Sequence, residues 1–202
     1  MGRPETDATR GFAINQLGNG LDEANHHEEA LSVREAELAT DRRLGYSESN
    51  ILVTQGNLAS TYRQLERFEE ALRLRRDVYR GRLKLNGEEH QETLRAASNY
   101  ADSLTSLKRF EEAKSLMRKV MPVARRVLGD DHNLTLKLRW AYAEVLYKDD
   151  GATLADLREA VTTLEDTERI ARRVLGGANP VTEGIEDDLR DARAALGARG
   201  LP

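Results

Sequence analysis

Apolar residues recur along this chain with the period of a helix. In "NLASTYRQLERFEEAL", residues 57–72, the side chains of Leu58, Ala59, Tyr62 and Leu65 follow the spacing i, i+1, i+4, i+7, which places them on one face of a helix. A second stripe starts after the letters "LERF" and consists of Ala71, Leu74, Val78 and Leu85. The pattern predicts two helices joined by a short turn, and no segment alternates for long enough to predict a strand.

The two stripes return at a fixed distance. Forty-two residues later, at residues 99–114, the chain reads "NYADSLTSLKRFEEAK", which aligns Asn57 with Asn99 and Phe68 with Phe110. The third copy carries a five-residue insert around "KDDGATLAD", after which the register resumes. Each copy ends with a glycine, the usual left-handed stop after a helix, at Gly45, Gly87, Gly129 and Gly176.

A copy of this length cannot bury its own apolar face, so the copies must stack. We expect units at about 8–45, 46–87, 88–129 and 130–178, followed by a capping helix at 180–198. Residues 1–202 would form a single repeat domain of six or more helices in antiparallel pairs, with turns near residues 66, 108 and 150. One small residue per unit, which is Gly18 in the first, lets the partner helix approach closely.

The segment "NLASTYRQLERFEEAL" and its continuation "LNGEEHQET" resemble the forty-two-residue tetratricopeptide repeat of the kinesin light chain family. Units of that family read roughly N-N-L-A-x-x-Y-x-x-x-G-[KR]-[YF]-x-E-A and end L-G-x-x-H-P-x-T. The resemblance extends over about residues 11–182, with Glu66 and Lys108 at the glycine position and Gln91 and Asn133 at the proline position. It implies an all-α fold, a right-handed α-solenoid of about four tetratricopeptide-type helix pairs plus a C-terminal capping helix.

The resemblance also implies that the first helix of each pair lines a concave surface that binds peptides. Matching to the family pattern places eight residues there: Asn15, Gln16, Asn57, Arg63, Arg95, Asn99, Lys137 and Trp140. Amides suit the backbone of an extended peptide, guanidinium groups suit carboxylates, and a tryptophan supplies an apolar anchor. Two alternatives stay open, namely that Asn57 and Asn99 bond within the array and that Trp140 packs in the core. The surface also holds acidic residues, so its charge is mixed.

The composition excludes several classes of function. Of the 202 residues 33% are charged, the formal net charge is −4, and acids and bases are interspersed, so we expect no partner that is a nucleic acid. The absence of cysteine removes disulfides and thiolate zinc sites. No apolar run is long enough to cross a bilayer and no signal peptide is visible, so we expect a cytoplasmic protein without membrane insertion.

No residue cluster has the spacing of a catalytic or metal site. His26 and His27 are adjacent and point apart, while His90 and His132 occupy equivalent loop positions, where helix capping is the simpler role. No glycine-rich phosphate loop and no nucleophile signature is found. We therefore expect no catalytic residue, no metal and no cofactor.

One proline interrupts the repeat pattern. Pro122 falls inside the second helix of the third unit, where it removes a backbone donor, so we expect a kink or local break between Met117 and Pro122. The five-residue insert near Asp149–Ala152 lengthens a turn between helices. Such insertions sometimes serve binding, but variation of the loop without a functional role is the simpler expectation.

The sequence predicts a non-enzymatic protein-interaction module whose concave groove holds a peptide or helix of a partner protein. The alternative is an architectural subunit that packs by its outer face or array ends into a larger multiprotein assembly. A third class, an enzyme or a regulator of one, has no catalytic segment to support it. The sequence names neither the partner nor the oligomeric state.

Overall fold

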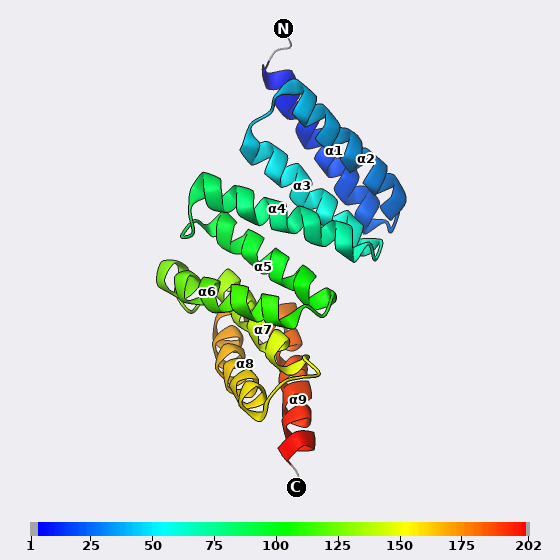
Figure 1. Cartoon of the computed structure of the whole chain (residues 1–202). Coiled ribbons are helices and arrows are strands. Elements are labelled where there is room, and N and C mark those ends of the chain that lie inside the picture. The colour runs from blue at the N-terminus through cyan, green and yellow to red at the C-terminus, as the bar shows by residue number, and fades with distance from the viewer. Residues whose placement is uncertain (1–3, 201–202) are drawn as a thin grey trace. The chain divides into compact units, whose positions relative to one another are not determined.

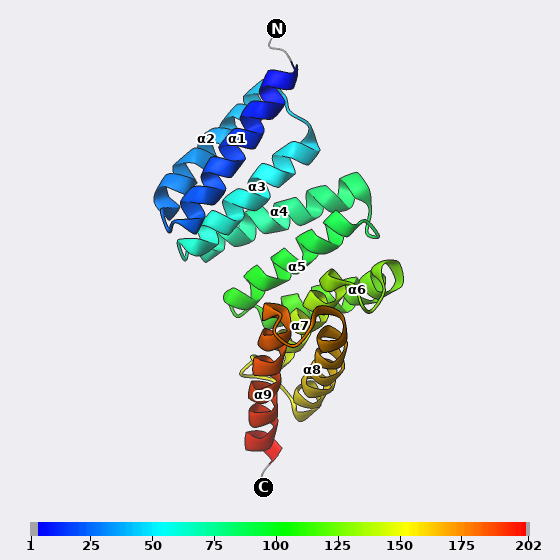
Figure 2. The ribbon, with the colours of Figure 1, turned by 180° about the vertical axis from the view of Figure 1, so that it is seen from behind.

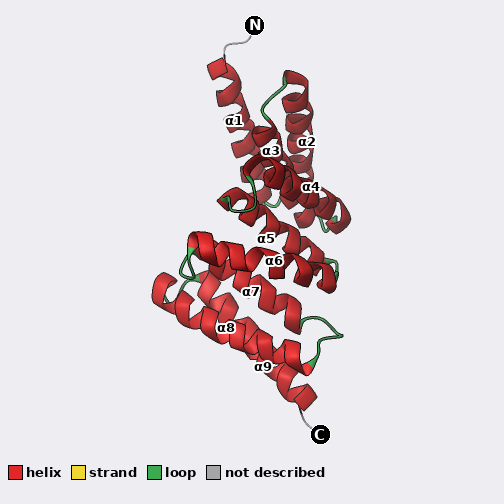
Figure 3. Ribbon diagram, turned by 60° about the vertical axis from the view of Figure 1, so that its left-hand side comes forward, coloured by secondary structure: helices red, strands yellow, loops and turns green. Residues whose placement is uncertain are grey.

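The protein is built from helices. The computed structural model describes residues 4–200, which contain nine helices and no strand (Figures 1 and 3). The helices are α1 (Pro4–Glu23), α2 (His27–Leu44), α3 (Glu48–Gln64), α4 (Phe68–Asn86), α5 (Gln91–Ser106), α6 (Phe110–Leu128), α7 (Asn133–Tyr147), α8 (Leu154–Leu175) and α9 (Pro180–Gly200). The prediction of an all-α fold with six or more helices is confirmed. The two ends of the predicted domain, residues 1–3 and 201–202, lie outside the described residues.

The turns inside the helix pairs lie where the repeat register predicts them. Loops near residues 66, 108 and 150 separate α3 from α4, α5 from α6 and α7 from α8. In the first two loops Glu66 and Lys108 adopt φ angles of 57° and 55°. This left-handed conformation costs a residue with a side chain roughly 1–2 kcal/mol. The cost explains why the kinesin light chain pattern has glycine at this position.

The described chain divides into two compact units between Leu85 and Asn86. In the first unit α1 packs against α2, α2 packs against α3, and α1 also contacts α3 (Figure 1). The core of this unit is centred on the buried Leu31, Leu38 and Leu58, around which Ile51, Tyr62, Leu65 and Leu74 pack. Burial of each leucine side chain contributes about 1.5–3 kcal/mol. The division into four repeat units within a single domain stays a prediction.

The second unit contains α5 to α9. Here α5 packs against α6 and α7, α6 against α7, and α7 against α8 (Figure 2). Its largest fully buried side chains include Leu104, Met117, Leu138, Leu146, Leu157, Leu164 and Ile185. The last helix, α9, contacts both α8 and α7 and buries Ile185, Leu189 and Ala192. Helix α9 therefore packs against this unit through a narrow apolar stripe.

Three helices of the second unit begin with the same kind of cap. A side-chain acceptor bonds the backbone N–H two residues ahead at His90 (Nδ1, 3.1 Å), His132 (Nδ1, 3.1 Å) and Asn179 (Oδ1, 2.9 Å). These residues precede α5, α7 and α9 and so occupy equivalent positions in successive repeats. The imidazole nitrogen therefore accepts the same capping hydrogen bond as the amide oxygen of an asparagine. The predicted capping role of His90 and His132 is confirmed.

Replacing His132 with alanine is expected to lower the free energy of unfolding by about 0.5–2 kcal/mol, because the Leu134 N–H loses its acceptor. His132→Asn is the matched control, since Asn179 already caps α9 through its amide oxygen. Urea denaturation of the wild type and both variants would measure the difference. An equal loss in both variants would show that packing of the ring, rather than the cap, stabilises this position.

The helix that contains Pro122 is not interrupted. Helix α6 continues from Phe110 to Leu128 through the proline, so the predicted local break is wrong, whereas a bend there stays a prediction. Buried side chains on both sides of the proline, at Met117, Val120 and Ala124, hold α6 in the core. Their burial offsets the roughly 3 kcal/mol that a proline costs in a helix interior.

The five-residue insert is anchored to the second unit. The buried Lys114 Nζ lies 2.9 Å from Glu111 Oε1 on α6 and 3.2 Å from Asp149 Oδ2 in the loop. Burial alone would lower the pKa of Lys114, but the hydrogen bonds to these two carboxylates raise it. The guanidinium of Arg199 donates to two backbone carbonyls of the same loop, those of Asp150 and Ala152. The insert therefore forms a fixed loop.

Candidate functional site

Two pockets lie between α1 and α3 in the first unit, with α2 beneath them, and together we call them the α1–α3 groove. The acidic pocket has a volume of about 420 Å³, and its lining includes Phe12, Asn15, Glu37, Asp41, Tyr46, Asn50, Val53 and Thr54. The amide pocket has a volume of about 270 Å³ and is lined by Asn19, Asp22, Glu23, Arg34, Asn57, Ser60 and Gln64. In both pockets α1 and α3 form the walls and α2 contributes charged side chains beneath, while α1 adds Asp22 and Glu23 to the amide pocket.

A glycine in α1 makes room for the charged group beneath the amide pocket. An ideal Cβ atom built on Gly18 would lie 3.0 Å from Arg34 Cζ and 3.1 Å from Arg34 Nη1. Real Cβ contacts are rarely this close, so a side chain at position 18 would displace the guanidinium. The small residue that the repeat pattern places here therefore admits an arginine side chain from the partner helix.

Arg34 organises the polar groups of the amide pocket, although only 2% of its surface is exposed. Its Nη2 donates to Asn19 Oδ1 at 2.8 Å and to Asp22 Oδ2 at 3.1 Å, and its Nε donates to Thr61 Oγ1 at 2.9 Å. The Thr61 hydroxyl in turn donates to Asp22 Oδ2 at 2.9 Å. Nη1 is buried and has no hydrogen-bond partner within the described residues. One donor beneath the groove therefore stays unused.

The acidic pocket has two buried carboxyl groups beneath it. Glu37 and Asp41 are each 5% exposed. Asp41 Oδ2 accepts a hydrogen bond of 2.7 Å from the Thr54 hydroxyl, whereas Glu37 Oε2 is buried without a partner in the described part of the chain. Burial raises the pKa of Glu37, the neighbouring Asp41 raises it further, and Arg34 lowers it. The negative charge of Asp41 beside it and its own burial therefore both disfavour ionisation of Glu37.

Four of the predicted site residues lie on α1 and α3. Asn15 lines the acidic pocket and Asn57 lines the amide pocket, while Gln16 and Arg63 are exposed on the same helices. Asn15 Oδ1 accepts a hydrogen bond of 3.2 Å from Asn19 Nδ2. Within residues 4–200 the amide of Asn57 bonds to no other side chain, which argues against the alternative that Asn57 serves only to fix the packing of the array.

The other four predicted residues lie on α5 and α7 in the second unit. Arg95, Asn99 and Lys137 are exposed, and the Arg95 guanidinium is paired with Glu92 on its own helix. The two pockets described on α8 and α9 of this unit are lined by none of the four predicted residues.

Trp140 is engaged by α9. Its Nε1 donates to Asp188 Oδ2 at 2.6 Å, and an ideal Cβ atom on Gly184 would lie 2.4 Å from its Cη2 atom. The hydroxyl of Tyr147 donates to the other oxygen of Asp188 at 2.8 Å, and burial together with this bond raises the pKa of Tyr147. This geometry favours the packing alternative for Trp140 over a role as a peptide anchor.

The charged residues of α2 were not among the predicted site residues. Arg34, Glu37 and Asp41 belong to the second helix of their pair, whereas the family pattern directs attention to the first helices. The sequence did contain an indication of these residues, because Arg34 falls in the apolar stripe between Leu31 and Leu38. A charged residue inside a buried stripe must have partners or line a cavity.

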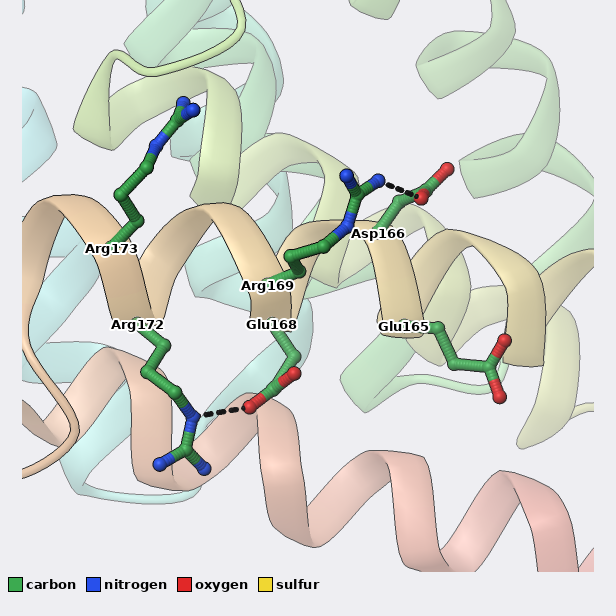
Figure 4. Close-up of a pocket in the computed structure, with 6 residues that line it drawn as sticks. All are labelled: Glu165, Asp166, Glu168, Arg169, Arg172 and Arg173. Atoms are coloured by element: carbon green, nitrogen blue, oxygen red, sulfur yellow. Dashed lines mark hydrogen bonds and ion pairs between the residues drawn. The ribbon is translucent and has the colours of Figure 1, made fainter.

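A pocket of about 600 Å³ on α8 is a weaker candidate (Figure 4). It is lined by charged residues that have partners of opposite charge. Arg169 Nη2 lies 2.5 Å from Asp166 Oδ1, Arg172 Nε lies 2.7 Å from Glu168 Oε1, and Arg173 Nη2 lies 2.8 Å from an acid on the loop before α7. Exposed pairs of this kind contribute only about 0–1 kcal/mol and stay hydrated. We interpret this pocket as an ordinary charged surface.

The described residues hold no group of three or more side chains that could bind a metal ion. None of the helices in this range is both long enough and apolar enough to cross a membrane.

Comparison with known proteins agrees with this architecture. The family model for the tetratricopeptide repeat matches residues 47–122 and 92–173, which is more than half of the chain. A search of curated proteins gave no match.

Solved structures share the fold. A single-residue variant of a Podosopora anserina kinesin light chain candidate with nearly identical TPR-like repeats aligns with a TM-score of 0.79 and 22% identity, over 95% of this chain and 88% of that chain. A second structure of these Podosopora anserina repeats aligns with a TM-score of 0.78 and 23% identity, over 99% and 91% of the two chains. BtubC (BKLC) from P. vanneervenii aligns with a TM-score of 0.65 and 14% identity, over 97% and 85%.

Repeats of this kind mediate protein–protein interaction, and their fold is a scaffold rather than a catalytic one. The helix pairs, the repeat register and the family match lead to one conclusion: this chain belongs to the tetratricopeptide repeat family.

Proposed function

We propose that this chain is a non-enzymatic interaction module whose α1–α3 groove holds an extended segment of a partner protein. The observation that carries the proposal is a row of amide side chains along α3. Asn50, Asn57 and Gln64 are spaced by seven residues and all line the groove. Seven residues make about two helical turns, so the three amides point to one side and follow each other at about 10.5 Å.

The spacing of the amides suits an extended peptide. Three residues of extended chain span about 10 Å, so one amide would meet the peptide backbone about every third residue. Each amide offers two donors and one acceptor. Asn15 and Asn19 on the opposite wall add a second set of polar groups from α1. A segment lying between the two helices would thus exchange hydrogen bonds with both walls.

The second unit would provide contacts of the same kind from its own first helices. Arg95 and Asn99 on α5 and Lys137 on α7 are exposed there. In the first unit Gln16 and Arg63 stand beside the groove residues on α1 and α3 and would add further polar contacts.

Truncating two amides of the row is expected to weaken partner binding without affecting the fold. Each lost hydrogen bond is worth about 0.5–1.5 kcal/mol, so the variant Asn57→Ala with Gln64→Ala should bind roughly five- to a hundredfold more weakly. Peptides selected on the full chain from a displayed library would serve as ligands, with dissociation constants measured by calorimetry. Thermal unfolding of the same samples should show an unchanged melting temperature.

The control is Gln55→Ala, which removes an amide from α3 at a position that lines neither pocket. It should leave the affinity unchanged. If the double variant binds as tightly as wild type and remains folded, the groove does not bind these peptides.

That outcome would favour the architectural alternative. One observation supports it, since α1 carries two large apolar side chains in solvent, with Phe12 at 66% and Leu17 at 53% exposure. Exposed apolar residues on one helix are suited to packing against another protein. Sedimentation measurements on the wild type and on Leu17→Ser would then test for assembly through α1.

A further inference from the structure

We propose that the acidic pocket binds the cationic side chain of an arginine or lysine in the partner segment, an inference that rests on the proposed function of the α1–α3 groove. The pocket provides two buried carboxyl groups, an apolar rim and an open side. This combination matches a long side chain with an apolar stem and a positive end.

The carboxyl groups beneath the pocket lack a cation of their own. Glu37 Oε2 is buried and accepts no hydrogen bond within the described residues, and Asp41 is bonded by the neutral hydroxyl of Thr54. The nearby cation, Arg34, is held by Asp22, Asn19 and Thr61 in the amide pocket. A buried carboxylate without a partner is unfavourable, and a cation supplied by a ligand would satisfy it.

The rim of the acidic pocket suits the apolar part of such a side chain. Phe12 on α1 and Val53 on α3 are 66% and 43% exposed, and Tyr46 adds an aromatic ring from the loop between α2 and α3. Methylene groups of arginine or lysine can pack against these side chains, and aromatic faces attract cations. The amide oxygens of Asn15 and Asn50 provide acceptors for the remaining N–H groups.

A metal ion fits the acidic pocket less well than a side chain. Hard cations such as Ca²⁺ take six to eight oxygen ligands, several of them carboxylates. In the described residues no group of three or more acidic or histidine side chains converges here. The apolar side chains of the rim would not stabilise a metal ion, because a metal ion has no apolar part that could pack against them.

The proposal can be tested with a probe that needs no knowledge of the partner. N-acetyl-arginine amide would be titrated into the isotope-labelled full chain while the backbone amide signals are followed by NMR. We expect saturable shifts at Asn50, Val53, Thr54 and Gly11, which line the pocket. N-acetyl-citrulline amide has nearly the same shape but no charge, and it should bind at least tenfold more weakly.

Two variants with the same change of charge distinguish the pocket from general electrostatics. Glu37→Gln removes the unpartnered carboxylate beneath the pocket and should abolish the response to the arginine probe. Glu28→Gln neutralises an exposed acid on the same helix and should leave the response to the arginine probe unchanged. Equal shifts with citrulline, or an unchanged response in Glu37→Gln, would overturn the inference.

The peptides selected for the groove separate failure of this inference from failure of the proposed function. The inference expects these peptides to contain a basic residue whose replacement by citrulline weakens binding at least tenfold in wild type but not in Glu37→Gln. Peptides that depend on Asn57 and Gln64 but need no basic residue would refute the inference and leave the groove function standing. Peptides indifferent to all of these variants would refute the groove function itself.

Glu37→Gln also carries an expectation about stability that does not depend on any ligand. The pKa of Glu37 is raised in the folded protein, so the fold is favoured while this carboxyl group is protonated and loses stability as the pH rises through the folded-state pKa. Glutamine cannot ionise, so the variant should be more stable than wild type near neutral pH. The difference should disappear below the ordinary pKa of glutamate.

Denaturation at several pH values would measure this difference. Of the groups that line the acidic pocket, only Glu37, Asp41 and the Tyr46 hydroxyl ionise, and α1 and α3 contribute no charged side chain to the lining. Arg34 lies on the same helix and opposes the shift. A variant that is less stable than wild type at neutral pH would show that Glu37 is satisfied in the folded protein, and the case for a missing cation would fail.

Discussion

Replacing Arg34 with alanine is expected to lower the free energy of unfolding of the first unit by about 3–5 kcal/mol. The guanidinium joins all three helices of the α1–α3 groove, because it bonds Asn19 and Asp22 on α1 and Thr61 on α3 from its place on α2. Its loss would leave the Asp22 carboxylate without its closest cation and would open a cavity beneath the amide pocket. Breaking such a pair costs more than the pair contributes, because the remaining carboxylate, with a side chain 16% exposed, stays largely shielded from water.

Two further variants identify the cause of the loss in Arg34→Ala. Arg34→Met keeps most of the side-chain volume and should recover the part of the loss that comes from the cavity. Arg43→Ala removes an exposed arginine from the same helix and should change stability by no more than about 0.5 kcal/mol. Hydrogen exchange at the backbone amides of α1, α2 and α3 would report the stability of this unit. Protection equal to wild type in Arg34→Ala would show that Asp22 and Thr61 find other partners.

Gly184→Ala is expected to destabilise the second unit by about 1–3 kcal/mol. The added methyl group would lie 2.4 Å from Cη2 and 2.6 Å from Cζ2 of Trp140. The indole cannot easily turn away, because its Nε1 is bonded to Asp188 on the same helix as the glycine. Alanine has the higher helix propensity by about 1 kcal/mol, so a net loss of stability requires that the clash outweighs this gain.

Gly197→Ala is the matched control for this variant. It makes the same substitution in the same helix, where no atom lies within 4 Å of the new methyl group. It should be neutral or stabilise the protein by up to about 1 kcal/mol. Thermal unfolding of both variants would measure the difference. Equal melting temperatures would mean that α9 shifts along α7 without cost.

Much of the fold can be predicted from the sequence because the same pattern of apolar residues and turn residues occurs several times. The repeat register that aligns Asn57 with Asn99 locates the helices, the turns and the stacking faces together. Where the pattern of one copy is ambiguous, the aligned copies indicate its helix boundaries. Glu66 and Lys108 have positive φ angles, so the turn forms at the position that the repeat register predicts although neither residue favours this conformation. Local preference is overridden there by the packing of the helices on both sides.

The candidate site was only partly predictable from the sequence. Asn15 and Asn57 line the α1–α3 groove, and the apolar stripe of each helix indicates which residues face away from the core. Their role in binding a peptide stays a prediction. The position of Trp140 depends on a partner 48 residues away on α9, and no repeat copy shows how a terminal helix docks. The buried position of Glu37 beneath the acidic pocket was not predicted. The burial of a charged side chain depends there on how three helices pack together.

The engagement of Trp140 by α9 gives the protein a natural optical reporter. Trp140 is the single tryptophan of the sequence, and its indole lies against Gly184 and is bonded to Asp188. Its emission wavelength should therefore register whether α9 is docked on α7, and it should give no signal for events confined to α1, α2 and α3. Circular dichroism, by contrast, sums every helix of the chain. Fluorescence and dichroism recorded on one unlabelled sample would thus show whether the two compact units melt in one transition or in two.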